Sequence, residues 1–495
     1  MHRRDFLAGS AAALGALALP ERLLADPYAP LPAAPRAPRP VRLRGRVTGD
    51  GRPLANVRVS DGLSVVRTGA DGRYTLVSDG TRPFVFVSTP AGWQAPRDAR
   101  GIPRFWAPIG EGTEQEASFA LVPRRGDARH SVLVLADPQT QDTYETGLLH
   151  AETVPDVVRT VQGLGDRAVL GVACGDIMFD DLSLYPEWER AVTRMGVPFL
   201  QVIGNHDLDF ASRTAEGASE TFRGRFGPTY HSFDMGAVHY VVLDNVFWHG
   251  AGYLGYLDQR QLDWLAADLQ GVERGAPVVV LAHIPALSTW DMRTGASTKP
   301  QPGNSTMNRE ALYKLLEPFA AYIVSGHQHE LEHVRDGGAQ HVVSGAVCGA
   351  WWSGPICYDG TPNGYLVLDA DDASIRWRYQ ATGKPSEHQL RVHRAGADRA
   401  APDDIVANVW AWDPRWTVRW LEDGQPVGLM SRRTGRDPLS VELHEGPKLP
   451  ARRPWVDPAA TTHLFYARPS PGVKEVTVEA TDGWGRRYRE TITLA

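Results

Sequence analysis

Five apolar runs in the middle of the chain each end abruptly in polar residues. Short apolar runs bounded by glycine predict buried strands, and Asp, Asn, Gln and His are residue types that bind metals or carry protons. In open α/β sheets the functional crevice lies beyond the carboxyl ends of the strands, so we expect the five ends to meet at one site. The runs and their polar ends are 132–136 with Asp137, Pro138 and Gln139; 168–174 with Gly175 and Asp176; 198–203 with Gly204, Asn205, His206 and Asp207; 278–282 with His283; and 322–325 with Gly326, His327, Gln328 and His329.

Segments with helical periodicity separate these runs. Apolar residues recur three or four positions apart in 149–164, 185–195, 258–269 and 308–319. Strands that alternate with amphipathic helices predict a layered α/β core, which we place at residues 128–384.

The segments on either side of this core have a different pattern. Short alternating strands with polar turns fill residues 41–124 and 385–495, which predicts a β-sandwich at each end. Five tryptophans in the second of these segments could form a carbohydrate-binding face, but at this spacing tryptophans are more often core residues. We therefore expect core positions for Trp410, Trp412, Trp416, Trp420 and Trp455.

The first residues contain a targeting pattern. Arg3 and Arg4 precede an alanine-rich apolar stretch over 8–20, which is shorter than the ~20 residues that a membrane-spanning helix needs. The pattern of residues 1–25 resembles a twin-arginine export signal, and the Pro/Ala-rich residues 26–40 predict a linker. We expect a periplasmic or secreted protein without a transmembrane span in its mature form.

Composition narrows the possible partners. The 495-residue chain is 42% hydrophobic, carries a net charge of −6 and has no block of Lys or Arg, which argues against a nucleic-acid polymer as the main partner. Of the three cysteines, Cys174 fits a small buried side chain, while Cys348 and Cys357 are close enough in sequence to pair; the sequence leaves that pairing open.

In order and spacing, the five polar blocks resemble the calcineurin-like metallophosphoesterase superfamily, whose pattern reads D-x-H, G-D, G-N-H-D, H and G-H-x-H. Four blocks match residue for residue, and the resemblance covers about residues 130–380. It implies a four-layer α/β core, with two mixed β-sheets flanked by helices, and two divalent metal ions (Mn, Fe, Mg or Zn). By position, it assigns one ion to Asp137, Gln139, Asp176 and His329, and the other to Asp176, Asn205, His283 and His327.

The flanking segments also have counterparts. Residues 41–124 resemble carboxypeptidase-regulatory-like sandwiches, and residues 385–495 are similar to immunoglobulin-like domains attached to exported bacterial members of the superfamily.

Gln139 departs from the family pattern, which usually has histidine at this position. Its amide oxygen is a harder and weaker donor than imidazole, which favours Mn²⁺ or Mg²⁺ over softer metals. We interpret Gln139 as a variant ligand.

The resemblance implies hydrolysis of a phosphate ester by attack of a metal-bridging hydroxide. His206 would stabilise transition-state charge or protonate the leaving oxygen, and Asp207 would orient His206 by accepting its other N–H. We expect a phosphodiesterase that acts on a small-molecule, glycan or lipid phosphate ester. A phosphomonoesterase (a protein or small-molecule phosphatase) and a glycan-binding protein with a degenerate phosphatase core are the open alternatives.

A loop after the last metal block contains paired tryptophans between glycines. Trp351 and Trp352, with Asn363 further along, are candidates for a substrate-binding wall, where indole rings stack on a base, a sugar or an acyl chain. An equally weighted alternative is a hydrophobic latch that packs against the C-terminal domain.

Overall fold

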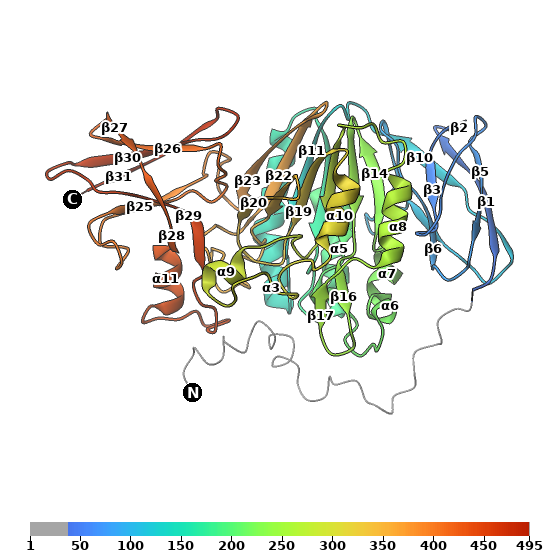
Figure 1. The fold of residues 1–495 in the computed structure, drawn as a ribbon, viewed down its shortest axis with the longest axis horizontal. Coiled ribbons are helices and arrows are strands. Elements are labelled where there is room, and N and C mark those ends of the chain that lie inside the picture. The colour runs from blue at the N-terminus through green and yellow to red at the C-terminus, as the bar shows by residue number, and fades with distance from the viewer. Residues whose placement is uncertain (1–37, 495) are drawn as a thin grey trace.

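The computed structural model describes residues 38–494, and its three parts follow one another along the long axis (Figure 1). A β-domain lies at each end, and an α/β core lies between them. The predicted export signal at 1–25 and most of the predicted linker lie outside the described residues. The predicted fold class, an α/β core with β-domains at both ends, is confirmed.

Two mixed sheets form the centre of the core. Within residues 38–494, one sheet has the order β13-β12-β11-β22-β23 and the other has the order β14-β15-β18-β19-β21-β20. The first consists of β11 (Arg129–Leu135), β12 (Ala168–Cys174), β13 (Phe199–Val202), β22 (Gly364–Asp371) and β23 (Ser374–Ala381). The second consists of β14 (His231–Met235), β15 (Val238–Val242), β18 (Pro277–Leu281), β19 (Ala320–Ser325), β20 (Glu332–Asp336) and β21 (Ala339–Val343).

Helices cover the outer face of each sheet, which gives the four layers expected. Side chains alternate along β11, so Val132 and Val134 join the core between the sheets, while Leu133 and Leu135 face the helices α4 and α5. On the second sheet, α8 and α10 occupy the opposite outer face (Figure 1). The helices are α3 (Thr143–Leu148), α4 (Val154–Gly163), α5 (Tyr185–Met195), α6 (Ala215–Ala218), α7 (Glu220–Phe226), α8 (Gln259–Asp268), α9 (Trp290–Thr294) and α10 (Arg309–Leu316).

The N-terminal domain packs two sheets against each other and against the core. One sheet is built on β1 (Val41–Gly49), and the other has the order β4-β3-β6-β8. Their remaining strands are β2 (Arg52–Pro53), β3 (Arg58–Ser60), β4 (Val65–Arg67), β5 (Arg73–Ser78), β6 (Phe84–Val87), β7 (Trp93–Gln94), β8 (Trp106–Pro108), β9 (Glu114–Glu116) and β10 (Phe119–Pro123).

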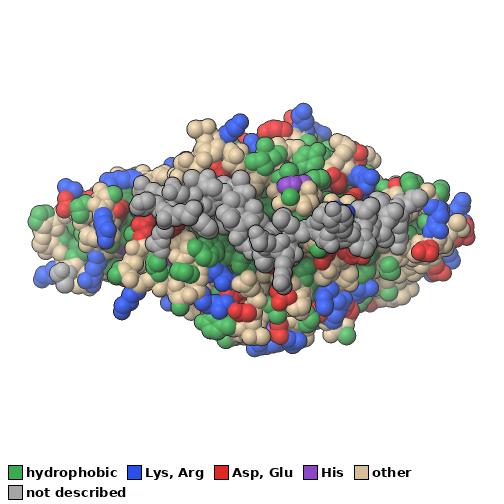
Figure 2. Space-filling view, turned by 90° about the horizontal axis from the view of Figure 1, so that it is seen from below, with side chains coloured by type: hydrophobic (Ala, Val, Ile, Leu, Met, Phe, Trp, Pro, Cys, Tyr) green, Lys and Arg blue, Asp and Glu red, His purple; other side chains and the backbone are tan. Residues whose placement is uncertain are grey.

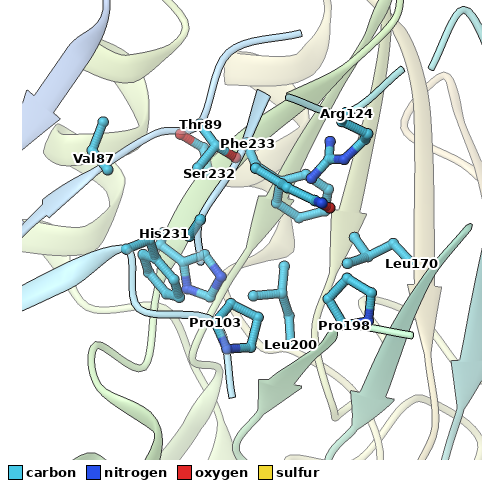
Figure 3. Close-up of a pocket in the computed structure, with 13 residues that line it drawn as sticks. Val87, Thr89, Pro103, Arg124, Leu170, Pro198, Leu200, His231, Ser232 and Phe233 are labelled. Carbon is cyan, nitrogen blue, oxygen red and sulfur yellow. The ribbon is translucent and has the colours of Figure 1, made fainter. Parts of the chain in front are cut away.

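A small cavity remains where this domain meets the core (Figure 3). Its volume is about 20 Å³, and Phe105, Leu200, His231 and Phe233 are among its lining residues. Neither ring nitrogen of the buried His231 has a hydrogen-bond partner among the described residues. A cavity of this size accommodates about one water molecule, so it is too small for a phosphate ester.

The C-terminal domain also contains two sheets, β24-β25-β29-β28 and β27-β26-β30-β31, and one helix that connects β28 to β29. Its elements are β24 (Arg391–His393), β25 (Ile405–Asn408), β26 (Thr417–Glu422), β27 (Gln425–Leu429), β28 (Ser431–Arg436), α11 (Pro438–Glu445), β29 (Ala460–Ala467), β30 (Glu475–Thr481) and β31 (Arg487–Thr493). Trp410, Trp416 and Trp420 are buried in its core, and Trp412 packs against that core. Trp455 differs, because 38% of it is exposed.

The surface carries both signs of charge. Figure 2 shows Lys and Arg side chains interspersed with Asp and Glu on one face, without a field of one sign. In the described part of the chain, no helix combines the length and the apolar character needed to cross a membrane. The remaining short strands, β16 (Val246–Trp248) and β17 (Tyr253–Gly255), pair with each other beside the site described next.

Candidate metal centre

The predicted strand ends meet at one edge of the two facing sheets. Asp137 and Asp176 follow β11 and β12 of the first sheet, while His283 follows β18 of the second. These three side chains are almost completely buried. All seven predicted ligands lie in this cluster, namely Asp137, Gln139, Asp176, Asn205, His283, His327 and His329.

One group of ligand atoms surrounds Nε2 of His283. This nitrogen lies 3.1 Å from Oδ1 of Asn205, 3.2 Å from Nδ1 of His327 and 3.2 Å from Oδ1 of Asp176. Ligand atoms of Asp176, His283 and His327 all fall within 4.8 Å of one another. This compact set of N and O donors fits one divalent ion.

The second group lies on the other side of Asp176. Nε2 of Gln139 is 3.4 Å from Oδ2 of Asp176, and Nε2 of His329 is 3.7 Å from Oδ1 of Asp137. Asp176 therefore directs one oxygen to each group, as a bridging carboxylate does. Rotation of the Gln139 amide by half a turn directs its oxygen to the same place.

Each ligand histidine is oriented by a backbone carbonyl. Nδ1 of His283 lies 3.0 Å from the carbonyl of Cys174, and Nδ1 of His329 lies 2.6 Å from that of Gly349. Nε2 of His327 lies 2.8 Å from the carbonyl of Gly303. Such contacts hold one N–H on the carbonyl and leave the other nitrogen as a lone-pair donor, the usual arrangement around a metal ion.

The electrostatics of the cluster suit a cation. Burial, assisted by the neighbouring Asp176, raises the pKa of Asp137 to about 8, which reflects two carboxylates in one dry site. Burial lowers the pKa of His327 to about 3 and that of His329 to about 4, so both rings are neutral at pH 7. His283 differs: burial opposes its charged form, but Asp176 and Asp137 outweigh burial and raise the pKa of His283 to about 9. The carboxylates thus create a negative field that suits a divalent cation.

The backbone is left-handed at most ligand positions. Asp137, Gln139, Asp176, His327 and His329 have φ values of 49°, 42°, 47°, 74° and 46°. Non-glycine residues adopt this conformation only where the surroundings enforce it, and such strain is concentrated at functional sites. The loops around these residues are closely packed: a Cβ on Gly204 would lie 2.0 Å from the amide nitrogen of Asp176, so position 204 requires glycine.

His206 lies at the rim of the cluster on a 3₁₀ turn, Asn205–Asp207. Its Nδ1 pairs with Oδ1 of Asp180 at 2.6 Å, which leaves Nε2 as the nitrogen that can exchange a proton with substrate. Burial opposes the charged ring, but Asp176 and Asp180 raise the pKa of His206 above its usual value. The Nδ1–Asp180 contact fixes the orientation of His206.

The expectation that Asp207 orients His206 is wrong. The Asp207 carboxylate accepts hydrogen bonds from the backbone amides of Ile177, Met178 and Gly204 and from the hydroxyl of Tyr185. Consecutive residues of a 3₁₀ turn point in different directions, so the two side chains separate. Asp207 instead fastens the turn to the loop that carries Asp176.

The tryptophan loop packs against the core and the metal-ligand cluster, and its predicted role as a substrate wall stays a prediction. Trp352 is buried, and its indole N–H donates to the carbonyl of Pro138 at 3.0 Å. Trp351 stacks on His329 with ring centroids 4.2 Å apart. Asn363 donates to the carbonyl of Gly354 at 3.1 Å and so ties this loop together.

The three cysteines are buried and unbonded, so the structure contains no Cys348–Cys357 disulfide. The Cys348 thiol lies 3.5 Å from Nδ1 of His329. Burial raises the pKa of the Cys348 thiol well above its usual range, so it is protonated at neutral pH.

Several rim residues were not identified from the sequence. The ring of Phe179 contacts that of His206 edge-on at 4.5 Å, and the ring of Tyr253 contacts that of His327 at 5.9 Å. The sequence could have indicated Asp180, since it lies in the loop that begins with Gly175 and Asp176. No sequence pattern indicated Phe179 or Tyr253.

Three family models match the chain in succession. The N-terminal model of calcineurin-like phosphoesterase matches residues 41–124, the calcineurin-like phosphoesterase model matches 130–331, and the C-terminal model matches 341–488. The chain belongs to the calcineurin-like phosphoesterase superfamily. This membership supports the assignment as a metal-dependent phosphoric ester hydrolase and implies a dinuclear divalent-metal site. The residues described above fit such a site.

Curated relatives in the superfamily are distant. The chain is 29% identical over 185 residues to the serine/threonine-protein phosphatase CPPED1 of Mus musculus. This match covers 35% of this chain and 57% of that protein. The CPPED1 of Rattus norvegicus is 30% identical over 140 residues, which is 26% of this chain and 44% of that protein. The chain thus spans about half the length of these relatives.

Among solved structures, the comparison found a dimetal phosphatase from Danio rerio, at 16% identity and a TM-score of 0.35. The match covers 51% of this chain and 96% of that chain. The purple acid phosphatase PPD1 from yellow lupin (Lupinus luteus) has 13% identity and a TM-score of 0.35, with 66% and 67% covered.

Proposed function

We propose that this protein is an exported, dinuclear metal-dependent phosphoesterase that hydrolyses a small-molecule phosphodiester. The observation that carries the hydrolase assignment is the convergence of seven ligand side chains on two groups that share Asp176, with each histidine oriented by a backbone carbonyl. No structural role explains such a concentration of buried polar groups with strained backbone.

The chain offers each ion a defined set of donors. Asp137, Gln139, Asp176 and His329 would hold one ion, and Asp176, Asn205, His283 and His327 would hold the other. When bound, the two ions supply Lewis-acid charge for the phosphate oxygens and lower the pKa of an attacking water.

His206 would act on the leaving group. Asp180 holds its Nδ1, so Nε2 faces outward and can deliver a proton to the leaving oxygen as the P–O bond breaks. Asp207 keeps the turn that carries His206 against the loop of Asp176.

The contacts of the site residues are the basis for proposing a diester over a monoester. Among residues 38–494, no Lys or Arg side chain forms a hydrogen bond or ion pair with any of the seven ligands, His206 or Asp207. Enzymes that bind dianionic phosphoryl groups commonly add Arg or Lys clamps to the metal charge. A diester carries a single negative charge and needs no such clamp.

A monoester is the second candidate, because the curated relatives are named serine/threonine-protein phosphatases. Hydrolysis of bis-p-nitrophenyl phosphate and p-nitrophenyl phosphate by signal-free protein, after chelation and reloading with Mn²⁺, separates the two. Metal-dependent turnover that is lost in Asp176→Asn is expected, with the diester preferred. Absence of turnover with two ions bound would instead favour a binding protein.

Export is supported by the pairing of Arg3 and Arg4 with the apolar stretch that follows. In a bacterial host, replacement of both arginines by lysine should retain the protein in the cytoplasm, whereas the unchanged chain should reach the periplasm. Equal periplasmic yield of both would refute this part of the proposal.

A further inference from the structure

One short segment of the C-terminal domain reaches around the metal centre. Residues 452–460 span the end of the connection between α11 and β29 and the first residue of β29, and they contact three core loops that carry or support site residues. The contacts involve the loop after Gln139, the loop after Asp176 and the tryptophan loop.

A pair of arginines fixes this segment to the core. Arg452 and Arg453 both donate to Oε1 of Glu145, at 2.7 Å and 3.0 Å, and the Glu145 side chain is fully buried. Arg452 also pairs with Asp142 at 2.6 Å. Buried, hydrogen-bonded ion pairs of this kind fix geometry, because removing one partner leaves a desolvated charge behind.

The Phe179 ring lies between Arg453 and the proposed proton donor. The Arg453 guanidinium sits 5.2 Å from the centroid of this ring, and the ring contacts His206. Nη2 of Arg453 binds Glu145 and Gln141, so this arginine ties the segment to the core.

Trp455, two residues further, contacts the tryptophan loop. Its ring is 4.9 Å from that of Trp351, which in turn stacks on the metal ligand His329. The Trp351 ring also lies parallel to Tyr358, at 5.9 Å, so its faces are occupied by protein. Trp455 is the exposed tryptophan of residues 38–494, whereas the other tryptophans of its domain pack in or against the domain core.

We propose that segment 452–460 forms one wall of the substrate site and that Trp455 selects phosphate esters that carry a planar ring. This inference rests on the proposed function. An exposed indole that is held in place by a second indole offers a rigid apolar face, and Trp351 links this face to the metal ligand His329. A planar aromatic group stacks on such a face, whereas a flexible alkyl or polyol group gains little from it.

A binding experiment tests the selection without requiring turnover. Phenylphosphonate and methylphosphonate share the phosphonate that the metal centre would bind, and only the first has a ring. Their dissociation constants are measured calorimetrically on the Mn²⁺-loaded protein. We expect wild type to bind phenylphosphonate more tightly, and Trp455→Leu to reduce that preference about fivefold, as for one lost aromatic pair.

Leucine keeps apolar contact with Trp351, so this variant should fold. Trp455→Phe should retain most of the preference. Leu429→Ala, at an exposed apolar residue on β27 of the same domain, should leave it unchanged. Unfolding temperature and bound Mn²⁺ are measured for each variant.

The two proposals fail in different ways. A wild type without preference, or a full preference retained in Trp455→Leu, overturns the role of Trp455. Hydrolysis of phenyl and glyceryl methyl phosphodiesters is measured in parallel. A binding preference that depends on Trp455, without hydrolysis of any ester, supports the substrate wall and refutes the hydrolase. Hydrolysis without the binding preference supports the hydrolase and refutes the role of Trp455.

Discussion

Oδ1 of Asp180 lies 2.6 Å from Nδ1 of His206, although the two residues come from loops that follow different strands. The contact leaves Nε2 of His206 as the free nitrogen at the rim of the metal centre. It makes Asp180, four residues after the bridging carboxylate, the group that orients the proposed proton donor.

Replacing Asp180 with Asn should slow turnover while both ions stay bound. Loss of a carboxylate that orients a histidine typically costs about 10–100-fold. The loss should be larger for methyl aryl phosphodiesters with a poor phenol leaving group than for methyl p-nitrophenyl phosphate, because only the poor leaving group needs a proton. kcat is compared across substituted phenols. Asp181→Asn, at the neighbouring position that caps a 3₁₀ turn, is the matched control and should show no such dependence.

Replacing His206 with Ala should remove most turnover and keep both ions, because none of the ligand atoms belongs to this residue. General acid catalysis is worth about 10²–10⁴ in rate. The double variant Asp180→Asn/His206→Ala should be no slower than His206→Ala alone, since Asp180 acts through His206. Additive losses would mean that Asp180 has a separate role.

Replacing Gln139 with His should strengthen the first ion site. Imidazole is a better donor than an amide oxygen, and its effect is largest for Zn²⁺. Equilibrium titration with Zn²⁺ and Mn²⁺ should show a rise in Zn²⁺ affinity of about tenfold or more, with a smaller change for Mn²⁺. Unchanged affinity for both metals would exclude Gln139 as a ligand.

The free energy of unfolding should fall as pH rises from about 6.5 to about 9 because of His239. Burial opposes its charged form, but hydrogen bonds to Asp234 and Asp268 raise the pKa of His239 to about 9. Arg58 of the N-terminal domain completes this buried group, so loss of the His239 proton leaves a net negative charge. A histidine with a raised folded-state pKa contributes stability that is fully present below its unfolded pKa and lost through the folded pKa.

His239 should contribute at most about 1.4 kcal/mol per pH unit to the slope, the value for one proton. Urea denaturation at several pH values measures the slope. His239→Gln should make the decline shallower, whereas His249→Gln, at an exposed residue, should leave its slope unchanged. An unchanged slope in His239→Gln would assign the decline to other groups.

The strand ends could be predicted from the sequence because the signal is local. An apolar run that stops at Asp137, Asp176 or His283 indicates where a strand ends and which donor follows it. The sheet topology then brings these strand ends together. The same reasoning located the helices: 185–195 was expected and α5 spans Tyr185–Met195.

Tertiary packing decided the rest. The partner of His206 depends on how two loops cross, which neither loop encodes alone, and adjacency along the chain suggested Asp207 instead. Trp455 lies more than a hundred residues beyond the last ligand and reaches the centre only because two arginines of its segment bind Glu145. The spacing of the tryptophans in the sequence does not distinguish the exposed Trp455 from the buried Trp410 and Trp416.

The left-handed backbone at five ligand positions lowers the stability of the fold at the residues that supply the metal donors. Each such residue costs about 1–3 kcal/mol relative to a relaxed backbone, and glycine at the same position removes that cost together with the donor. A descendant of this chain that no longer needed its metals could therefore gain stability through the very substitutions that end catalysis. At Asp137, Gln139, Asp176, His327 and His329 the donor and the left-handed backbone belong to the same residue, so this chain holds its metal donors at the expense of stability.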